Sequence, residues 1–383
     1  MDHEAQVDLL DELLGLRKEK SAYLDEAVTY SETLRYIDEA QFRLERERIF
    51  LKTPFLIAHA SELPDEGSFL RRDCFGIPIL LTRDRDGMVH AFYNVCRHRG
   101  ARLVAAESGC KHRFSCPYHA WTWDNTGRLI TAPHKEQGFP GLNIEEYGLK
   151  KIACAEKSGW VWCLIDGEAS DNAIEEHLAP IKDDMDWLDF TSFEVHAHDE
   201  RTWNCNWKIL VEGGLEAYHF RVAHAKTIGL LFHDNLSTYK MFGNHIRSIL
   251  ARVSVDELIE MPRKDWRLRD HANVLYNLFP NAAWLVQFDH VVLIQFFPFS
   301  VDETRIRCVT LRPKQDAPLT EKQQTYWDKN HQLTVTTLEE DFALGENIQS
   351  AMALGVNERL TFGRFEGALH RFNETVDEAV NGV

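Results

Sequence analysis

Two short Cys/His pairs constrain this chain more than any other feature of its sequence. The first pair lies in Cys96-Arg97-His98 and the second in Cys116-Pro117-Tyr118-His119, and residues 99–115 separate them. Two thiols and two imidazoles at this spacing are typical of a metal site. A tetrahedral zinc ion is one candidate, but zinc fingers pair cysteine with cysteine and histidine with histidine. Each pair here mixes the two residue types, which favours a site of another kind.

Mixed pairs suit a Rieske [2Fe–2S] cluster, in which two cysteines bind one iron and two histidines bind the other. Neutral imidazoles lower the negative charge of such a cluster and raise its reduction potential, so that it accepts and passes on single electrons. We therefore predict that Cys96, His98, Cys116 and His119 bind this cluster. The alternative, four metal-free residues on a loop-rich β domain, does not explain the paired spacing. The remaining cysteines lack such partners and are expected to be packed thiols: Cys74, Cys110, Cys154, Cys163, Cys205 and Cys308.

A second group of candidate ligands follows the pattern E-x₃-E-x₂-H-x₄-H and consists of Glu212, Glu216, His219 and His224. On a continuous helix, the spacing of i, i+4 and i+7 would place the first three on one face. His224 would lie roughly 140° from His219, because each residue turns the helix by about 100°. Both imidazoles can therefore bind one ion only if the helix ends or loosens between Phe220 and Ala223.

Two histidines and one carboxylate form the facial triad of non-haem Fe(II) oxygenases, which leaves coordination positions for O₂ and substrate. The carboxylate could come from this segment or from a distant one. The alternative is a charged helix face with two hydrogen-bonded histidines. The upstream cluster favours the metal site, because an electron-transfer centre requires an acceptor.

The pattern along the chain predicts an all-β region inserted in a larger α+β domain. Residues 1–50 are expected to be a helical segment that packs on the larger domain, residues 51–165 the all-β domain, and residues 166–383 the larger domain. Hairpins are predicted at Asp86-Gly87 and at residues 125–127, between short apolar strands. In the C-terminal part we expect a helix over 204–223, two apolar strands over 271–300, and helices over 319–354 and 366–380.

Composition narrows the classes of partner. The formal net charge is −17, from 43 Lys+Arg against 60 Asp+Glu, which argues against nucleic acid and anionic membranes. The longest apolar runs, such as residues 291–299, are too short to span a bilayer. The first residues show no signal-peptide pattern, so the cysteines are expected to be free thiols in a soluble, cytoplasmic protein.

Several further motifs extend this pattern over most of the chain, and together the sequence resembles the catalytic α subunits of Rieske non-haem iron oxygenases, the aromatic-ring-hydroxylating dioxygenase family. The resemblance implies a Rieske domain inserted in a helix-grip (START-like) catalytic domain with an antiparallel sheet. The motifs that carry it are residues 96–100, residues 116–121, Asn206-Trp207-Lys208, Phe279-Pro280-Asn281 and residues 362–366.

The resemblance also implies roles for particular residues. The family's third iron ligand is an Asp eight residues before a Gln, which corresponds to Asp341 and Gln349, with Glu339 and Glu340 as nearby alternatives. The mononuclear Fe(II) would then be bound by His219, His224 and Asp341. The family usually has an Asp three residues before the first iron-binding His, and this chain has Glu216 there. That carboxylate is expected to link His219 to the cluster ligand His119 of a neighbouring subunit.

The function implied is that of a terminal oxygenase that activates O₂ and hydroxylates a small organic substrate, with an aromatic one expected first. Electrons would come from NAD(P)H through a separate reductase, with or without a ferredoxin. A cross-subunit route requires a ring, which implies a head-to-tail homotrimer. The alternative is a monooxygenase or demethylase that acts on a quaternary ammonium compound, which Glu216 suggests. A set of aromatic residues could line a substrate pocket or belong to the sheet core: Tyr276, Phe279, Trp284, Phe288, Phe296 and Phe297.

Metal analysis separates these interpretations from two others. An oxygenase of this kind is expected to contain three iron atoms per chain, two in the cluster and one mononuclear, and to be red-brown. A Rieske electron carrier would contain only the two cluster irons. A zinc-stabilised binding module would be colourless. Iron and acid-labile sulfide assays together with the visible absorption spectrum decide among the three.

Overall fold

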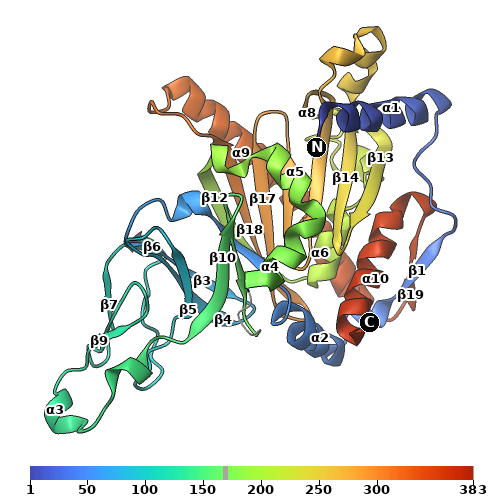
Figure 1. Cartoon of the computed structure of the whole chain (residues 1–383). Coiled ribbons are helices and arrows are strands. Elements are labelled where there is room, and N and C mark those ends of the chain that lie inside the picture. The colour runs from blue at the N-terminus through green and yellow to red at the C-terminus, as the bar shows by residue number, and fades with distance from the viewer. Residues whose placement is uncertain (167–170, 383) are drawn as a thin grey trace. The chain divides into compact units, whose positions relative to one another are not determined.

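A computed structural model describes residues 1–166 and 171–382. The chain folds into two compact units, one formed by Leu51–Ala179 and the other by Met1–Phe50 together with Pro180 onward (Figure 1). The N-terminal segment thus belongs to the same unit as the C-terminal half, and the first unit is an insertion in the second. Residues 50 and 165 as domain limits stay predictions.

The inserted unit is built around an antiparallel sheet in the order β2-β11-β10-β5-β4-β3-β6, and a smaller sheet has the order β7-β8-β9. The two predicted hairpins are confirmed, because β4 pairs with β5 around Asp86-Gly87 and β8 pairs with β9 around residues 125–127. The strands are β2 (Phe55–His59), β3 (Ser68–Cys74), β4 (Ile77–Arg83), β5 (Val89–Tyr93), β6 (Ser108–Cys110), β7 (Arg113–Ser115), β8 (Thr122–Asp124), β9 (Leu129–Thr131), β10 (Lys151–Lys157) and β11 (Trp160–Leu164), and the short helices are α3 (Lys135–Gly138) and α4 (Asp171–Leu178).

The larger unit contains an antiparallel sheet in the order β12-β18-β17-β16-β15-β14-β13. The long helix α9 packs against β12 and β18, and α6 packs against both α9 and β17, which gives the helix-grip arrangement that the sequence predicted (Figure 1). The strands are β12 (Phe193–Trp203), β13 (Phe232–Phe242), β14 (His245–Arg252), β15 (Ala272–Leu278), β16 (Ala282–Val286), β17 (Val291–Ser300) and β18 (Glu303–Pro313), with β1 (Thr29–Glu32) paired to β19 (Arg359–Phe362). The helices are α1 (His3–Glu19), α2 (Glu39–Glu45), α5 (Lys182–Leu188), α6 (Trp207–Gly214), α7 (Phe220–Ala223), α8 (Leu268–His271), α9 (Glu321–Met352) and α10 (Gly367–Asn381).

Two details of the predicted elements were wrong. Residues 271–300 form three strands rather than two, because a turn at Phe279-Pro280-Asn281 separates β15 from β16. These strands are buried along nearly their whole length. The sequence therefore lacks the alternation of apolar and polar residues that would have shown where one strand ends and the next begins. The helix expected over 204–223 is also interrupted, since α6 ends at Gly214.

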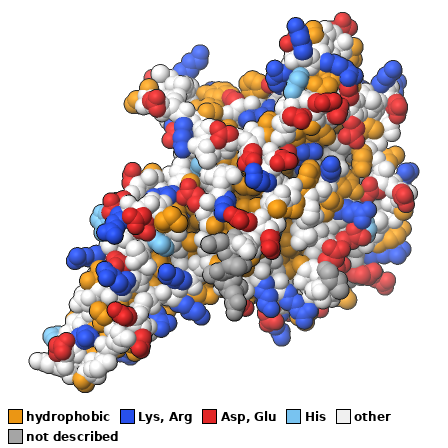
Figure 2. All heavy atoms as spheres, viewed as in Figure 1, with side chains coloured by type: hydrophobic (Ala, Val, Ile, Leu, Met, Phe, Trp, Pro, Cys, Tyr) orange, Lys and Arg blue, Asp and Glu red, His pale blue; other side chains and the backbone are white. Residues whose placement is uncertain are grey.

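The surface carries charged side chains of both signs. Acidic and basic side chains are interspersed over the face drawn in Figure 2. Among the helices that the structure describes, none combines the length and the hydrophobicity that crossing a bilayer requires.

A buried polar cluster fixes the start of α6. Asn206 is fully buried and caps the helix, with its Oδ1 accepting from the Lys208 N–H at 3.0 Å. Its Nδ2 donates to the carbonyl oxygens of Tyr36 at 3.1 Å and Val301 at 2.7 Å. Its own N–H donates to Gln349 Oε1 of α9 at 3.0 Å. Asn206 therefore joins the N-terminal segment, the sheet and α9 at one point.

An ion pair completes this cluster. Lys208 Nζ lies 2.6 Å from Glu45 Oε1, and both side chains have no exposed surface. The second oxygen of Glu45 accepts from Trp207 Nε1 at 2.8 Å. A buried pair of this kind is costly to break, because the remaining charge stays without water or a counterion.

Lys208→Met should lower the free energy of unfolding by about 3–5 kcal/mol, because it leaves the Glu45 carboxylate buried and unpaired. Chemical denaturation followed by tryptophan fluorescence measures this loss. Lys182→Met is the matched control, because Lys182 forms an exposed i,i+4 pair with Asp186 and should have little effect. The double variant Glu45→Gln/Lys208→Met should recover part of the loss. Equal, small effects of the two lysine variants would show that the buried pair does not hold α6.

Candidate metal centres

The two Cys/His loops of the inserted unit have the same backbone hydrogen bonds. Each cysteine N–H donates to the carbonyl oxygen five residues later at 2.8 Å, and each cysteine carbonyl accepts from the N–H four residues later, at 3.0 Å for Cys96 and 2.9 Å for Cys116. The fourth residue after each cysteine is left-handed, with φ of 77° at Gly100 and 56° at Ala120. The loops are therefore matched tight turns that present one cysteine and one histidine each.

The cysteines of these loops are buried, so that a charged side chain is disfavoured there until a metal replaces the thiol proton. Cys96 and Cys116 are each 3% exposed, and burial, together with the neighbouring Cys116 thiol, raises the pKa of Cys96. The rings of His98 and His119 have centroids 4.8 Å apart. Burial lowers the pKa of His98, and its buried Nδ1 has no hydrogen-bond partner among the described residues. A neutral imidazole with an unpartnered nitrogen is a fitting ligand for iron.

The spacing of these four residues also bears on the zinc alternative. Ligands of one tetrahedral zinc lie at most about 4.6 Å apart, because each is 2.0–2.3 Å from the ion. In the part of the chain that the structure describes, no three of Cys96, His98, Cys116 and His119 have ligand atoms within 4.8 Å of one another. The mixed Cys/His pairs, rather than these distances, favour a two-iron cluster over a single zinc ion.

The second candidate centre depends on where α6 stops. The helix ends at Gly213-Gly214, a pair of residues with poor helix propensity. A loop follows, and the single turn α7 then runs from Phe220 to Ala223, with His219 before it and His224 after it. The helix is therefore interrupted, but the break expected between Phe220 and Ala223 was wrong, because α6 ends earlier and these residues form α7, with the His224 N–H donating to the Phe220 carbonyl oxygen at 3.2 Å.

The early end of α6 corrects the expectation that Glu212, Glu216 and His219 share one helix face. Glu212 lies on α6, where its Oε1 accepts from Tyr36 Oη at 2.7 Å and from Asn373 Nδ2 at 2.8 Å. Burial raises the pKa of Glu212 to about 7. Glu216 and His219 lie in the loop beyond α6, away from these contacts.

Three ligand atoms converge beyond this loop. His219 Nε2 lies 3.2 Å from His224 Nε2, and Asp341 Oδ1 of α9 lies 3.3 Å from the first nitrogen and 2.9 Å from the second. These three residues form the group predicted from the sequence. Two imidazole nitrogens and one carboxylate oxygen on one side of a site fit a facial triad.

The opposite nitrogen of each imidazole is held by a carboxylate. His219 Nδ1 is hydrogen-bonded to Glu216 Oε1, and Glu216 Oε2 accepts from the His219 N–H at 3.2 Å. His224 Nδ1 lies 2.8 Å from Glu340 Oε2, which also accepts from Thr227 Oγ1 at 2.6 Å. Carboxylates in these positions orient metal-binding imidazoles and raise their basicity. Both rings are thereby turned so that Nε2 faces Asp341.

The competing acids are placed elsewhere. Glu340 contacts the far nitrogen of His224, and Glu339 pairs with Arg201 at 3.0 Å near the surface. Glu340 was expected only as an alternative ligand, and its position behind His224 was not predicted from the sequence. Sequence spacing alone cannot show which of several adjacent acids on a helix is the metal ligand. Their side chains leave the helix in different directions, and only the packing of the helix shows which one faces the histidines.

The charges of this group are strongly coupled. Burial alone would lower the pKa of His219, but hydrogen bonds to Asp341 and Glu216 outweigh it and raise the pKa to about 10. The pKa of His224 is also raised, because hydrogen bonding to Asp341 and Glu340 outweighs burial. Burial opposes ionisation of Asp341, but the two imidazoles hold its pKa below the usual value. Without a metal, protons on the two imidazoles offset the negative charge of the neighbouring carboxylates. A bound cation can take the place of these protons.

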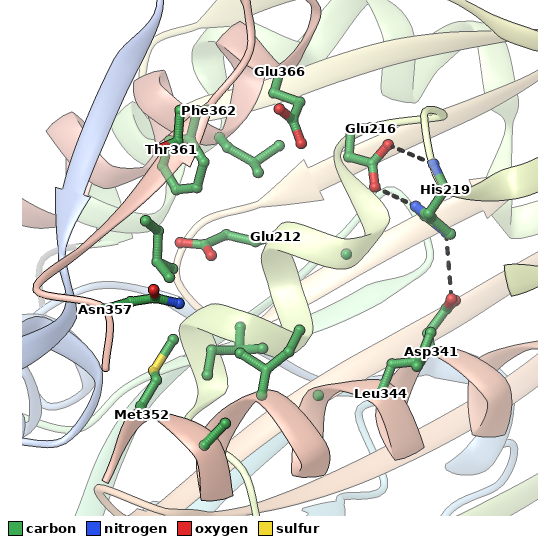
Figure 3. A pocket seen from close by; sticks show the side chains of 17 residues that line it. Glu212, Glu216, His219, Asp341, Leu344, Met352, Asn357, Thr361, Phe362 and Glu366 are labelled. Atoms are coloured by element: carbon green, nitrogen blue, oxygen red, sulfur yellow. Dashed lines mark hydrogen bonds and ion pairs between the residues drawn. The ribbon is translucent and has the colours of Figure 1, made fainter. Parts of the chain in front are cut away.

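Two cavities lie along α9, and the first of them is lined by two residues of the triad. The carboxylate cavity, of about 440 Å³, is lined on one side by Glu212, Glu216, His219 and Asp341; Figure 3 shows Glu216 and Asp341 both turned toward His219. The α9 cavity, of about 420 Å³, follows α9 from Tyr326 to Leu338. Of the aromatic residues that could have lined a substrate pocket, Phe288 lines the α9 cavity and Phe296 lines a 40 Å³ cavity beside Asp341. The others belong to the buried core: Tyr276, Phe279, Trp284 and Phe297.

Comparison with protein families agrees with both centres. Residues 53–152 match the Rieske [2Fe–2S] domain, and residues 185–382 match the catalytic domain of the ring-hydroxylating alpha subunits. The chain belongs to this family. The predicted fold class is thereby confirmed, and so are the cofactors expected for the family, a [2Fe–2S] cluster and a mononuclear non-haem iron. The roles of the individual ligand residues stay predictions.

Individual relatives of this oxygenase family member cover only part of it. It is 33% identical over 196 residues to the glycine betaine monooxygenase oxygenase subunit of Pseudomonas aeruginosa, which is 51% of this chain and 45% of that protein. It is 34% identical over 181 residues to the biphenyl 2,3-dioxygenase subunit alpha of Rhodococcus jostii, 46% and 39% of the two chains. The matched part thus spans less than half of either relative.

A solved structure extends the similarity of fold. A quaternary ammonium Rieske monooxygenase, described as giving insight into carnitine oxidation by gut microbiota and inter-subunit electron transfer, matches 93% of this chain and 96% of its own. The TM-score is 0.77 and the sequence identity 23%, so the likeness is one of fold.

Metal binding at the triad should release protons. Without metal, His219 with a pKa of about 10 is protonated at pH 7, so an ion must displace about one proton from it, and more if His224 is also charged. The affinity for Zn²⁺, used as a probe, should therefore rise with pH. Isothermal titration calorimetry in buffers of different ionisation enthalpy counts the protons. In Asp341→Asn, which loses the main partner of both imidazoles, fewer protons should be released and binding should weaken. Binding of Zn²⁺ without proton release would contradict this assignment.

Proposed function

We propose that this protein is the terminal oxygenase component of a multi-component Rieske oxygenase that hydroxylates a small organic substrate. The observation that carries the proposal is the convergence of His219 Nε2, His224 Nε2 and Asp341 Oδ1 within 3.3 Å, in a chain that also carries the matched Cys/His loops. When bound, the cluster would supply single electrons and the mononuclear Fe(II) would activate O₂. A pure electron carrier would have no use for the triad.

The chain's own residues would hold and orient these groups. Cys96, His98, Cys116 and His119 would bind the cluster, and the triad would bind the iron. Glu340 would fix the tautomer and orientation of His224, and Glu216 would do the same for His219.

We propose that the carboxylate cavity receives His119 of a neighbouring copy, which would bring that imidazole to Glu216. Support comes from the position of Glu216, which binds His219 Nδ1 and also lines the cavity. The exposed apolar side chains Leu344 and Ile348 line the same cavity and would be covered by a second copy. Contacts of one kind between successive copies close into a ring, so a head-to-tail homotrimer is the proposed assembly.

The electron donor would be a separate NAD(P)H-dependent reductase, with or without a ferredoxin. Such a donor would place the enzyme in the cytoplasm, where the eight cysteines of the chain would stay reduced.

Two substrate classes are supported. An aromatic substrate is the first, and the biphenyl dioxygenase relative supports it. A quaternary ammonium compound is the second, supported by Glu216 in place of the more usual Asp and by the glycine betaine monooxygenase relative.

With a surrogate reductase and NADH, the iron-loaded protein should consume O₂ when a suitable substrate is added, with small aromatic acids and quaternary amines as the test panel. Glu216→Gln should keep its iron and cluster absorption but lose about 10- to 100-fold in substrate-dependent O₂ uptake, because the amide cannot hold the His219 N–H as a carboxylate does. Glu339→Gln is the control, since Glu339 pairs with Arg201 near the surface. Absence of iron at the triad, or full activity of Glu216→Gln, would contradict the proposal.

A further inference from the structure

The α9 cavity runs along the part of α9 that precedes Asp341. It follows α9 from Tyr326 to Leu338, which is about 18 Å along the helix at roughly 1.5 Å per residue. Leu338 also lines the small cavity beside Asp341, so this end approaches the iron ligands. Tyr326 marks the distal end. Most of the wall is apolar, formed by Ile228, Leu231, Phe232, Leu285, Leu333 and Leu338.

A single strongly basic side chain interrupts this wall. Among the described residues that line the cavity, Arg252 at the end of β14 is the one lysine or arginine. Its Nε and Nη2 donate to Asn273 Oδ1 at 2.9 and 2.5 Å. Its charge interacts with those of Asp289 and Tyr326, and Tyr326 is the cavity-lining residue of α9 that is farthest along the helix from Asp341. In the described part of the chain, no carboxylate oxygen lies within 4.0 Å of its guanidinium.

The acid nearest in this region is already occupied. Asp289 Oδ1 lies 2.8 Å from His290 Nδ1, and Asp289 Oδ2 accepts from Tyr326 Oη at 2.6 Å. These hydrogen bonds outweigh burial and hold the pKa of Asp289 below its usual value, so it stays ionised. It offsets part of the arginine charge from a distance but does not form an ion pair with it.

A second guanidinium adds positive charge behind the cavity wall. Arg269 Nε donates to the carbonyl oxygen of Gln287, a residue that lines the cavity, at 2.9 Å. Its Nη2 is buried and has no hydrogen-bond partner among the described residues. Burial lowers the pKa of both Arg252 and Arg269, and the exposed Asp270 is the remaining acid in range. Two partly buried guanidinium groups without a paired carboxylate favour an anion at this end.

Resting on the proposed oxygenase function, we infer that the substrate carries a carboxylate that binds Arg252, while an apolar body extends along α9 toward Leu338 and Asp341. A guanidinium binds a carboxylate through planar, charge-assisted hydrogen bonds, which fix its orientation as well as its distance. The group to be oxidised is then the end of the molecule away from the carboxylate. Neutral hydrocarbons lack such a carboxylate and are therefore not expected to be substrates. Aromatic acids and betaines both carry one and remain candidates.

Binding of a matched ligand panel tests the inference. The panel is the series of ω-phenylalkanoates from phenylacetate to 6-phenylhexanoate, each paired with its primary amide, and the protein is the full chain with its metals. Calorimetry should show that at least one carboxylate binds wild type more tightly than its amide. Arg252→Gln should weaken that carboxylate about 30-fold or more, because an ion pair is lost, and change the amide less than about threefold. Arg252→Lys should restore part of the preference.

Arg263→Gln is the charge-matched control, because Arg263 is exposed and pairs with Asp11. It should bind every ligand as wild type does. The inference is overturned if no carboxylate is preferred over its amide by wild type, or if Arg252→Gln weakens carboxylate and amide equally. Restored preference in Arg252→Lys excludes a merely structural role for Arg252.

The proposed function has a separate readout in the same samples. A red-brown protein that consumes O₂ with substrate but shows no Arg252-dependent preference keeps the oxygenase function and loses this inference. A protein that lacks the iron loses the oxygenase function, whatever its affinity for carboxylates.

Discussion

The buried ion pair between Lys208 and Glu45 is the interaction on which the geometry of the proposed iron centre depends. Together with Asn206 it fixes the first turn of α6 against the N-terminal segment. Asn206 also binds Gln349, so that the same cluster holds α9. Gly345 lies between them, where a side-chain carbon would come within 3.0 Å of Leu210, and its absence lets the two helices approach closely. The histidines follow α6 and Asp341 lies on α9, so one buried cluster sets the distance between ligands that are far apart in sequence.

The two glycines at the end of α6 stop this helix before the histidines, so that the residues after Gly214 begin a loop. His219 and His224 lie at the two ends of the single helical turn α7, so the end of α6 does not by itself bring them together. Each imidazole is oriented by its own carboxylate, Glu216 for His219 and Glu340 for His224. Orientation is thus a property of the loop and of α9 rather than of a single helix face. A loop held only by its own backbone would leave the nitrogen atoms free to turn from Asp341.

The sequence could predict features that depend on local chemistry. The Cys/His loops and both hairpins follow from residue type and spacing, and Asp341 could be proposed through its offset from Gln349 in the family pattern. The end of α6 at Gly214 could not be located, because the apolar and acidic pattern continues at helical spacing beyond it. The number of strands over 271–300 was equally hidden by burial on both faces. Glu340 and Arg252 could not be assigned roles, since an acid or a base becomes functional only through what packs around it.

Helix α9 divides the centre into two sides. Residues before Asp341 line the α9 cavity, including Leu333, Thr337 and Leu338, whereas residues after it line the carboxylate cavity, including Leu344 and Ile348. Asp341 stands at the boundary. The side that contains Glu216 carries an excess of carboxylates, and the other side carries an arginine at its far end. An anionic substrate would be repelled from the first side and attracted to the second, so the charges themselves would separate the path of the substrate from the path of the electron.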